Sequence, residues 1–279
     1  AVEGHPVRLQ WSHEDDLSWS PYGPAMVVSL AGATDANGRI SAWRHEMWSN
    51  PHIARPGLQD SPSLLAAWHI DPPFAQPNGI DSLAGINPAS QRNAVPLYDF
   101  ANQSVVHHLL DRLPVRTGTL RAIGAYLNAF SIECFMDELA VAAEIDPVDL
   151  RLRHLSDPRG IAVIQAARNG AGMLAGRTRD GVRGMGMGFA RYSNEASYAA
   201  VVAEVEAGET VRVTRIVAAV DCGRAINPNG IANQIEGGVV QAMSFATKEA
   251  VRFDRTRILS RSWDTYPILR FSEAPPVET

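Results

Sequence analysis

The chain has 279 residues, of which 46% are hydrophobic and 20% charged, and its formal net charge is -5. This composition is ordinary for a globular protein with a sizeable core, and it excludes the strongly basic surface typical of nucleic-acid binders. The apolar runs are well short of the roughly 20 residues that a membrane-spanning helix needs, so we expect no membrane span.

The chain contains only two cysteines, Cys134 and Cys222, which lie far apart in the sequence. They are too few for a disulfide framework, a structural zinc site or an iron–sulfur cluster. Any redox relay must therefore lie outside this chain. The chain begins at Ala1 without a methionine and ends at Thr279 soon after a proline pair, which suggests a processed product or a piece of a longer protein.

The first part of the chain, residues 1–112, is predicted to be rich in β-structure with a long loop. Residues 6–11 alternate like a strand, and residues 25–49 hold two extended runs around Asn37-Gly38, a pair that favours a tight hairpin turn. Residues 50–93 are dense in proline, glycine, serine and asparagine, which predicts the loop. His107-His108 is too closely spaced for a shared metal and is predicted to have a structural or surface role.

The second part, residues 113–175, is predicted to be a turn led by Arg121 followed by helices. Residues 125–144 show apolar residues at helical spacing, which leaves Glu133 and Asp137 on the predicted polar side. Asp146-Pro147 has the pattern of an N-cap followed by proline at the first helical position, so a second helix is expected there. A short third helix is expected over residues 161–169.

The third part, residues 176–279, is predicted to be a strand hairpin followed by a helix. Strands are expected over residues 200–205 and 211–220, with the helix over residues 231–250. The Gly184–Gly188 run has the wrong spacing for a dinucleotide loop, and we expect a mobile or closely packed glycine run instead. A basic, glycine-rich linker is expected over residues 173–184. Strands and helices in clusters indicate an α+β fold.

The last predicted helix carries adjacent glycines, Gly237 and Gly238, near its start. Each glycine lowers helix stability by about 1 kcal/mol relative to alanine, so another interaction must offset this loss. Two explanations remain open: close packing of another backbone, or close approach of a ligand to the end of the helix. Arg121 likewise has two explanations, a phosphate contact shared with helix N–H groups or a salt bridge with a surface acid.

Other enzyme classes have little support in the sequence. Serine, histidine and aspartate are plentiful, but the G-x-S-x-G elbow of a hydrolase is missing. Glu236 and Glu273 are interpreted as capping or surface residues rather than as a general base. An unrelated hydrolase remains an alternative, supported only by the abundance of these polar residues.

Several long motifs occur in a recognisable order: LPVRTGTLRAIGAYLNAFSIECFMDELA, DPVDLRLRHLSDPR, VDCGRAINPNGIANQIEGGVVQAMSFATKEAVRFD and SWDTYPILRFSEAPPVE. Together they closely resemble the molybdenum-binding large subunit of the xanthine oxidase and aldehyde oxidoreductase family. Within that family the chain is most similar to subunits of the isoquinoline 1-oxidoreductase and nicotinate dehydrogenase type. The resemblance implies a cofactor-binding fold of mixed sheets packed with helices.

The resemblance implies a molybdopterin cofactor with molybdenum, in the cytosine dinucleotide form usual in bacteria. The cofactor would be met from two sides by Arg121, Ala122, Gly124, Gln234, Gly237 and Gly238, while Tyr22, Ile123 and Tyr126 would line the substrate pocket. Two positions depart from the family pattern. Ala122 stands where the family usually has glycine, and Ile123 stands where some relatives place an aromatic residue.

The implied activity is hydroxylation of an aldehyde or an N-heteroaromatic substrate, with water as the oxygen source. The implied partners are an iron–sulfur subunit, the remaining part of the large subunit and the small-molecule substrate. The family's catalytic glutamate is expected beyond Thr279, so Glu273 is rejected as the base. This chain is therefore expected to contain no catalytic residue and no metal ligand and to be inactive alone. We expect a cytoplasmic location, with the periplasm as the alternative. The competing hypothesis is a non-catalytic structural or assembly module that keeps the fold.

Overall fold

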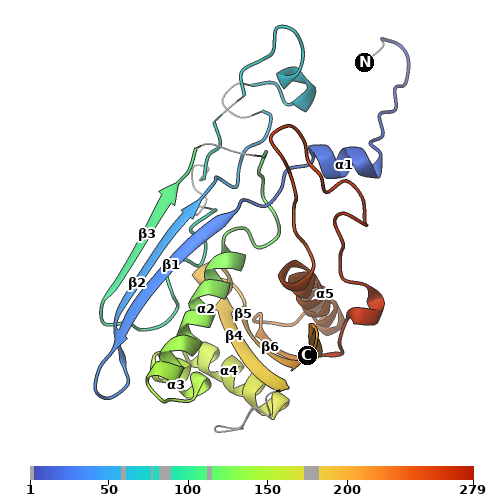
Figure 1. Cartoon of the computed structure of the whole chain (residues 1–279). Helices are drawn as coiled ribbons and strands as arrows, with labels where there is room; N and C mark the ends of the chain where they lie inside the picture. The colour runs from blue at the N-terminus through green and yellow to red at the C-terminus, as the bar shows by residue number, and fades with distance from the viewer. Residues whose placement is uncertain (1–2, 58–60, 77, 82–88, 112–114, 173–181) are drawn as a thin grey trace.

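The protein contains two mixed β-sheets packed with helices (Figure 1). The computed structural model describes residues 3–57, 61–76, 78–81, 89–111, 115–172 and 182–279. One sheet has the order β1 (Met26–Thr34), β2 (Ile40–Ser49), β3 (Gln103–Leu109); the other has the order β4 (Arg183–Arg191), β5 (Tyr198–Ala207), β6 (Val211–Asp221), β7 (Val277–Glu278). Among the strand pairs of the described residues, β2–β3 and β6–β7 are parallel and the others are antiparallel. The predicted α+β fold with mixed sheets is confirmed.

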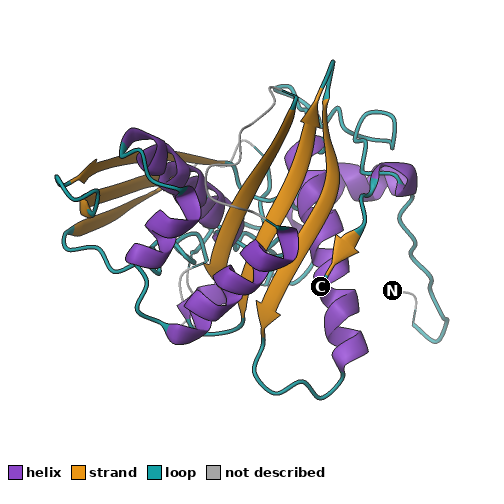
Figure 2. Cartoon of the chain, turned by 90° about the horizontal axis from the view of Figure 1, so that it is seen from below, coloured by secondary structure: helices purple, strands orange, loops and turns teal. Residues whose placement is uncertain are grey.

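The described residues form five α-helices and three 3₁₀-helices. They are α1 (His13–Trp19), η1 (Leu65–Trp68), α2 (Ala125–Ala142), α3 (Pro147–Arg153), α4 (Pro158–Ala171), η2 (Tyr192–Asn194), α5 (Pro228–Thr247) and η3 (Phe271–Glu273). Helix α2 contacts both β1 and β4, and α4 lies across β5 and β6 (Figure 2). Helix α5 lies on the opposite side of that sheet from α4. Among the described helices, none is long and apolar enough to cross a membrane.

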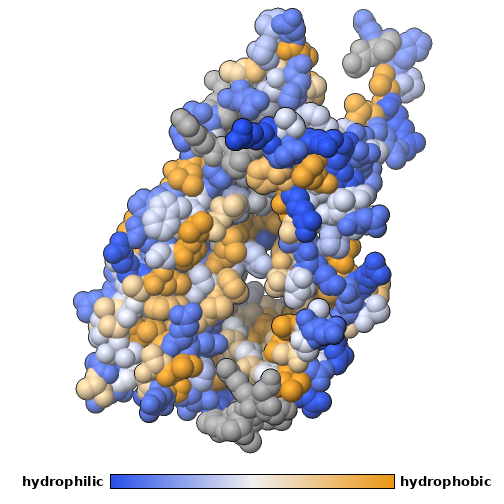
Figure 3. Space-filling view, in the orientation of Figure 1, coloured by the Kyte–Doolittle hydropathy of each residue, from blue (hydrophilic) through white to orange (hydrophobic). Residues whose placement is uncertain are grey.

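The surface is hollowed between the part built from α2 and the part built from α5 and the C-terminal segment (Figure 3). Helix α5 has only two buried residues, Met243 and Ser244, both in its C-terminal half. The adjacent glycines lie at the middle of α5, and the residues from Pro228 to Gly238 are therefore held away from the core.

Asparagine or aspartate followed by proline starts three of the helices. The side chains of Asp146, Asp157 and Asn227 each accept hydrogen bonds from N–H groups in the first turn, and proline occupies the first helical position each time. The start of α3 is thus as predicted. Helix α4 is longer than the predicted residues 161–169 because its own cap lies at Asp157.

One hydrophobic core connects all three predicted parts of the chain. It includes Trp43 from β2, Met136 from α2, Ile164 from α4 and Val202 from β5. The segments 1–112, 113–175 and 176–279 therefore share a single core, although each contributes its own secondary structure.

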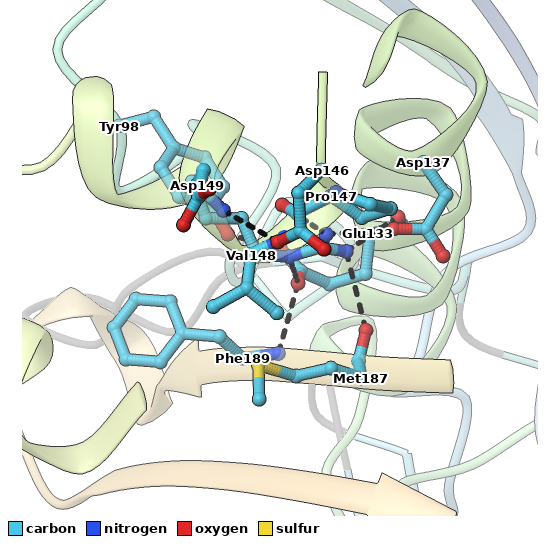
Figure 4. Close-up of polar contacts among 10 residues, drawn as sticks. Tyr98, Glu133, Asp137, Asp146, Pro147, Val148, Asp149, Met187 and Phe189 are labelled. Atoms are coloured by element: carbon cyan, nitrogen blue, oxygen red, sulfur yellow. Dashed lines mark hydrogen bonds and ion pairs between the residues drawn. The ribbon is translucent and has the colours of Figure 1, made fainter. Parts of the chain in front are cut away.

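A buried ion pair joins α2, α3 and β4 within this core (Figure 4). The Arg151 side chain is fully buried, and its Nε donates to Glu133 Oε2 at 2.9 Å. Its Nη1 donates to Asp137 Oδ1 at 2.6 Å, and its Nη2 donates to the Met187 carbonyl at 3.2 Å. Burial lowers the pKa of Arg151, but Glu133, Tyr98 and Asp137 together outweigh burial and hold that pKa above its usual value.

Glu133 does not lie on a solvated face of α2, so the predicted polar side of this helix is wrong at that position. It is only 7% exposed and accepts hydrogen bonds from Tyr98 Oη at 2.8 Å and Phe189 N at 2.9 Å. Burial raises the pKa of Glu133. The reason for the miss is that α2 is enclosed on more than one side, and the basic partner that permits burial of this charge lies 18 residues away.

Residues 6–11 were also predicted wrongly, because they form an exposed extended arm instead of a strand. Val7 is 62% exposed and Leu9 80%, and no described strand pairs with the arm. Period-two alternation alone does not supply the neighbouring strand that a ladder needs. The arm ends at Ser12, whose side chain forms a capping box with Asp15 at the start of α1.

The predicted β1–β2 hairpin is confirmed, with a different turn. Only Gly38, with φ 72°, has a left-handed backbone there, and the Asp35 carboxylate accepts the N–H groups of Asn37 and Arg39. The strands predicted around residues 200–205 and 211–220 are confirmed as β5 and β6.

The Gly184–Gly188 run is neither a mobile nor a closely packed glycine run, because it lies in β4. Met187 points into the core, whereas a Cβ added at Gly186 or Gly188 would have no atom within 4 Å. Residues 173–181 of the predicted linker lie outside the described residues.

Candidate functional site

The segment before Arg121 is anchored to two other parts of the chain. Thr117 forms a bridge with Tyr22, and its buried hydroxyl donates to the Pro51 carbonyl at 2.8 Å. The Thr119 hydroxyl donates to the His52 carbonyl at 3.2 Å. These contacts fix the approach of the chain to the turn at residues 121–124.

The turn itself contains two consecutive non-glycine residues with left-handed backbone. Ala122 has φ 71° and Ile123 has φ 55°. This region is disfavoured by L-residues and most of all by β-branched ones. Strained positions of this kind cluster at functional sites because the surrounding structure must hold them in place. The position where the family usually has glycine is thus one that favours glycine.

Gly124 is explained by packing inside the protein. A Cβ added to it would lie 2.2 Å from the Ser90 carbonyl oxygen, and its N–H donates to the Ala89 carbonyl at 3.1 Å. The N–H of Gly124 is therefore already used. The guanidinium of Arg121, which is exposed, is the group of this turn that remains available to an anion.

Arg121 reaches the glycine-bearing helix α5. Its Nη1 donates to Gln241 Oε1 at 3.0 Å, and its Nη2 lies 3.5 Å from where a Cβ on Gly238 would be. Among the ion pairs of the described residues, none includes Arg121. Its partner is a neutral amide, so the salt-bridge explanation does not describe this structure.

Helical spacing places Gln234 on the same face of α5 as this contact. Gln234, Gly238 and Gln241 follow the i, i+4, i+7 pattern of one helix face. Gln234 and Gly237 are exposed, and a Cβ added at Gly237 would have no atom within 4 Å. The adjacent glycines therefore differ: Gly238 lies against Arg121, and Gly237 borders open space.

Sequence reasoning missed Gln241, which directly contacts Arg121. The available signal was its spacing of seven residues from Gln234, which places both amides on one helix face.

Aromatic and acidic groups fix the C-terminal half of α5 beside the start of α2. Tyr126 and Phe245 make an edge-to-face contact with ring centroids 5.7 Å apart. Burial, and next the Glu249 carboxylate, raise the pKa of Tyr126. Glu249 in turn accepts a hydrogen bond from Tyr266 Oη at 2.7 Å, and burial followed by this bond raises the pKa of Tyr266.

Tyr22 lies apart from this contact. It lines a separate cavity bounded by α1, and its hydroxyl donates to the Leu17 carbonyl. Burial raises its pKa, and the Asp16 charge adds to the effect. The structure thus brings Arg121 and Tyr126 to α5, whereas Tyr22 faces the other cavity.

Glu273 is committed to a salt bridge. It pairs with Lys248 and accepts the Arg270 N–H at 2.9 Å, and the Lys248 hydrogen bond lowers its pKa. A carboxylate with a lowered pKa is a poor general base, which agrees with its rejection from the sequence.

The histidine pair is structural, as predicted. The ring of His107 bonds to the Ser49 hydroxyl at 2.9 Å, and that of His108 bonds to Glu46 at 2.9 Å. Within the described part of the chain, no cluster of acidic, histidine and cysteine side chains is arranged to hold a metal ion.

Part of the chain matches a known protein family. Residues 142–275 match the family model described as the molybdopterin cofactor-binding domain. The matched segment is slightly shorter than half of the chain and is similar to this domain family. It includes α5 with Gln234 and both glycines, and Arg121 lies upstream of it.

Two curated relatives are similar to this chain over nearly its whole length. One is a nicotinate dehydrogenase component from Pseudomonas putida, which is 34% identical over 98% of this chain and 23% of the relative. The other is the beta component of isoquinoline 1-oxidoreductase from Brevundimonas diminuta, which is 28% identical over 98% of this chain and 33% of the relative. The family resemblance predicted from the motifs is confirmed. The chain spans a third or less of the length of these relatives.

The chain also has the fold of a solved protein. Quinoline 2-oxidoreductase from Pseudomonas putida 86 superimposes with a TM-score of 0.74 at 12% identity, over 96% of this chain and 56% of that one. At this identity the likeness concerns the fold.

Proposed function

We propose that this chain forms part of the molybdopterin pocket of a molybdenum hydroxylase that oxidises an aldehyde or an N-heteroaromatic compound. The observation that supports this most is the contact of Arg121 with Gly238 and Gln241, which joins two motifs 120 residues apart. The proposal extends the family similarity of residues 142–275 to the activity suggested by the relatives' names.

The residues at this contact fit an anionic, hydrogen-bonding cofactor. Arg121 offers an exposed guanidinium with no carboxylate partner among the described residues, and Arg is well suited to phosphate. Gln234 supplies an exposed amide on the same helix face, and the open side of Gly237 leaves room for a planar group. We assign the cytosine dinucleotide form because of the family resemblance.

In this proposal, the general base and the iron–sulfur centres of the enzyme lie outside this chain. When bound, the molybdenum cofactor would supply the two-electron oxidation of the substrate carbon, with water providing the oxygen. Arg121 and Gln234 would hold and orient the cofactor, and Tyr126 with Ile123 would border the substrate. The general base would come from another part of the large subunit, and an iron–sulfur subunit would take the electrons. By itself this chain would be inactive.

Cofactor content tests the proposal. The chain is co-produced with the rest of the large subunit and its iron–sulfur partner, and molybdenum and pterin fluorescence are measured on the purified complex. We expect both in the wild type and a loss of most of both in Arg121→Ala, with Arg44→Ala, an exposed arginine on β2, as the control. A complex without molybdenum and pterin would instead support the structural or assembly module.

A further inference from the structure

A second cavity, of about 460 Å³, lies between α1, η1, the residues before Thr117 and the turn at residues 253–261. Its walls combine aromatic rings with guanidinium groups. The rings are those of Trp19, Tyr22, Trp68, His69 and Phe253, and the guanidinium groups are those of Arg116, Arg255, Arg257 and Arg261. The volume is in the range of small-molecule sites.

The positive charge of this cavity is only partly balanced. Four arginines face two aspartates, Asp15 and Asp254. Both aspartates are occupied by hydrogen bonds from their own turns: Asp15 accepts from Ser12, and Asp254 accepts from Thr256.

The arginines differ in how they are engaged. Arg261 pairs with Glu14, and Arg116 donates to a neutral acceptor, the carbonyl of Trp19. Arg257 lies 3.9 Å from Asp254, and Arg255 has no ion pair among the described residues. Among the described residues, Arg116 and Arg255 thus have no ion pair, and Arg257 has only the long contact with Asp254.

The aromatic wall is held in place by α1. Trp19 contacts His69 edge-to-face with ring centroids 5.3 Å apart. At the other end of α1, His13 stacks on Trp263 with centroids 4.3 Å apart, beside the Glu14–Arg261 pair. Helix α1 has no buried residues, so these contacts fix it as a wall of the cavity. A preformed wall lowers the ordering cost of binding.

We propose that this cavity binds a planar aromatic carboxylate. The ring would lie against Trp19, Trp68 and His69, and the carboxylate would be held by Arg255 and Arg257, with Arg116 behind them. Arginine binds carboxylates through two parallel N–H donors, and aromatic walls favour a flat ring by stacking. This site is separate from the Arg121–α5 contact and does not depend on molybdenum.

Calorimetric titration of the full chain with 2-naphthoate tests the proposal. We expect saturable binding of 2-naphthoate. The neutral 2-naphthamide should bind at least about tenfold more weakly, because it cannot make the charge-assisted hydrogen bonds of the carboxylate. Naphthoate binding should also weaken at about 1 M salt. Equal binding of acid and amide would overturn the proposal. So would equally tight binding of inorganic phosphate, which would show a general anion site.

Variants localise the site. The double variant Arg255→Gln, Arg257→Gln removes exposed charges and is expected to weaken naphthoate binding about tenfold or more, as is Trp19→Leu through loss of the ring contact. Arg212→Gln, on β6 outside the cavity, is the matched control and should bind like the wild type. Wild-type affinity in both cavity variants, or equal loss in the control, would overturn the assignment.

Discussion

Ala122 occupies a backbone conformation that suits glycine better. With φ 71°, an alanine there carries a strain of about 1–2 kcal/mol, which glycine would relieve. Glycine also increases the conformational entropy of the unfolded chain, and this offsets part of the gain in stability. We therefore expect Ala122→Gly to leave the free energy of unfolding unchanged or to raise it by up to about 1 kcal/mol. Urea unfolding followed by circular dichroism measures this.

Ala129 in α2 provides the matched control for this substitution. It lies in the helix interior, where Ala→Gly is expected to lower stability by about 1 kcal/mol. If Ala122→Gly destabilised the protein as much as Ala129→Gly does, the left-handed conformation at Ala122 would be contradicted.

Individual residues show where sequence reasoning succeeds and where it stops. Capping at Asp146 was predictable because it depends on neighbours within three residues. Burial of Glu133 was not, because it depends on Arg151, a residue of another helix. Gly124 was assigned to the cofactor, yet its absent side chain makes room for Ser90, which belongs to the long loop. Interactions between residues close in sequence can be predicted from the sequence, whereas contacts between distant residues cannot.

At the scale of elements, Gly237 lowers the stability of α5 and leaves open space beside the helix. A Cβ at Gly237 would meet no atom, so Gly237→Ala is expected to stabilise the isolated chain by up to about 1 kcal/mol through helix propensity. If a cofactor lies against this position, the same change lowers the pterin content of the assembled complex. Urea unfolding and pterin fluorescence measure the two effects.

Ala232→Gly is the opposite control on the same helix, because it should destabilise α5 without filling the space beside Gly237. Gly237→Ala with full pterin content would contradict a cofactor role for this glycine and leave its role in α5 unexplained.

The buried ion pair couples three elements, and its two carboxylates should differ in importance. Glu133→Gln leaves Arg151 buried without its buried partner charge, which is expected to lower the free energy of unfolding by about 3–5 kcal/mol. Asp137 has a 41% exposed side chain, so Asp137→Asn should cost about 1 kcal/mol or less. Denaturant unfolding of both variants compares them. Equal losses would contradict the central position of Glu133.

For the molecule as a whole, the class of fold and most helices and strands followed from periodicity, caps and turns. The placement of the sheets around α2 did not, since contacts such as Tyr98 to Glu133 join distant segments. The same holds for the candidate site. The resemblance implied that Arg121 and the glycine-bearing helix meet around a cofactor, and only the fold shows that Arg121 lies directly against Gly238 and donates to Gln241.

The long loop ties the Arg121 turn to the rest of the molecule through a histidine that should make stability depend on pH. His52 is 2% exposed, neither ring nitrogen has a hydrogen-bond partner among the described residues, and burial lowers its pKa from 6.5 to about 4. The Asp81 charge opposes this shift, whereas His107 and Arg92 add to it. The folded protein therefore binds fewer protons at His52 than the unfolded chain between pH 4 and 6.5.

This contribution of His52 is fully present above pH 6.5 and is lost as the pH falls towards 4, with a total of up to about 3 kcal/mol. Free energies of unfolding at several pH values should fall less steeply in His52→Leu than in the wild type, and His5→Gln, at an exposed position, should follow the wild type. Parallel curves for His52→Leu and the wild type would contradict the buried neutral state. Because the His52 carbonyl accepts the Thr119 hydroxyl, protonation of this ring should loosen the anchor of the Arg121 turn first.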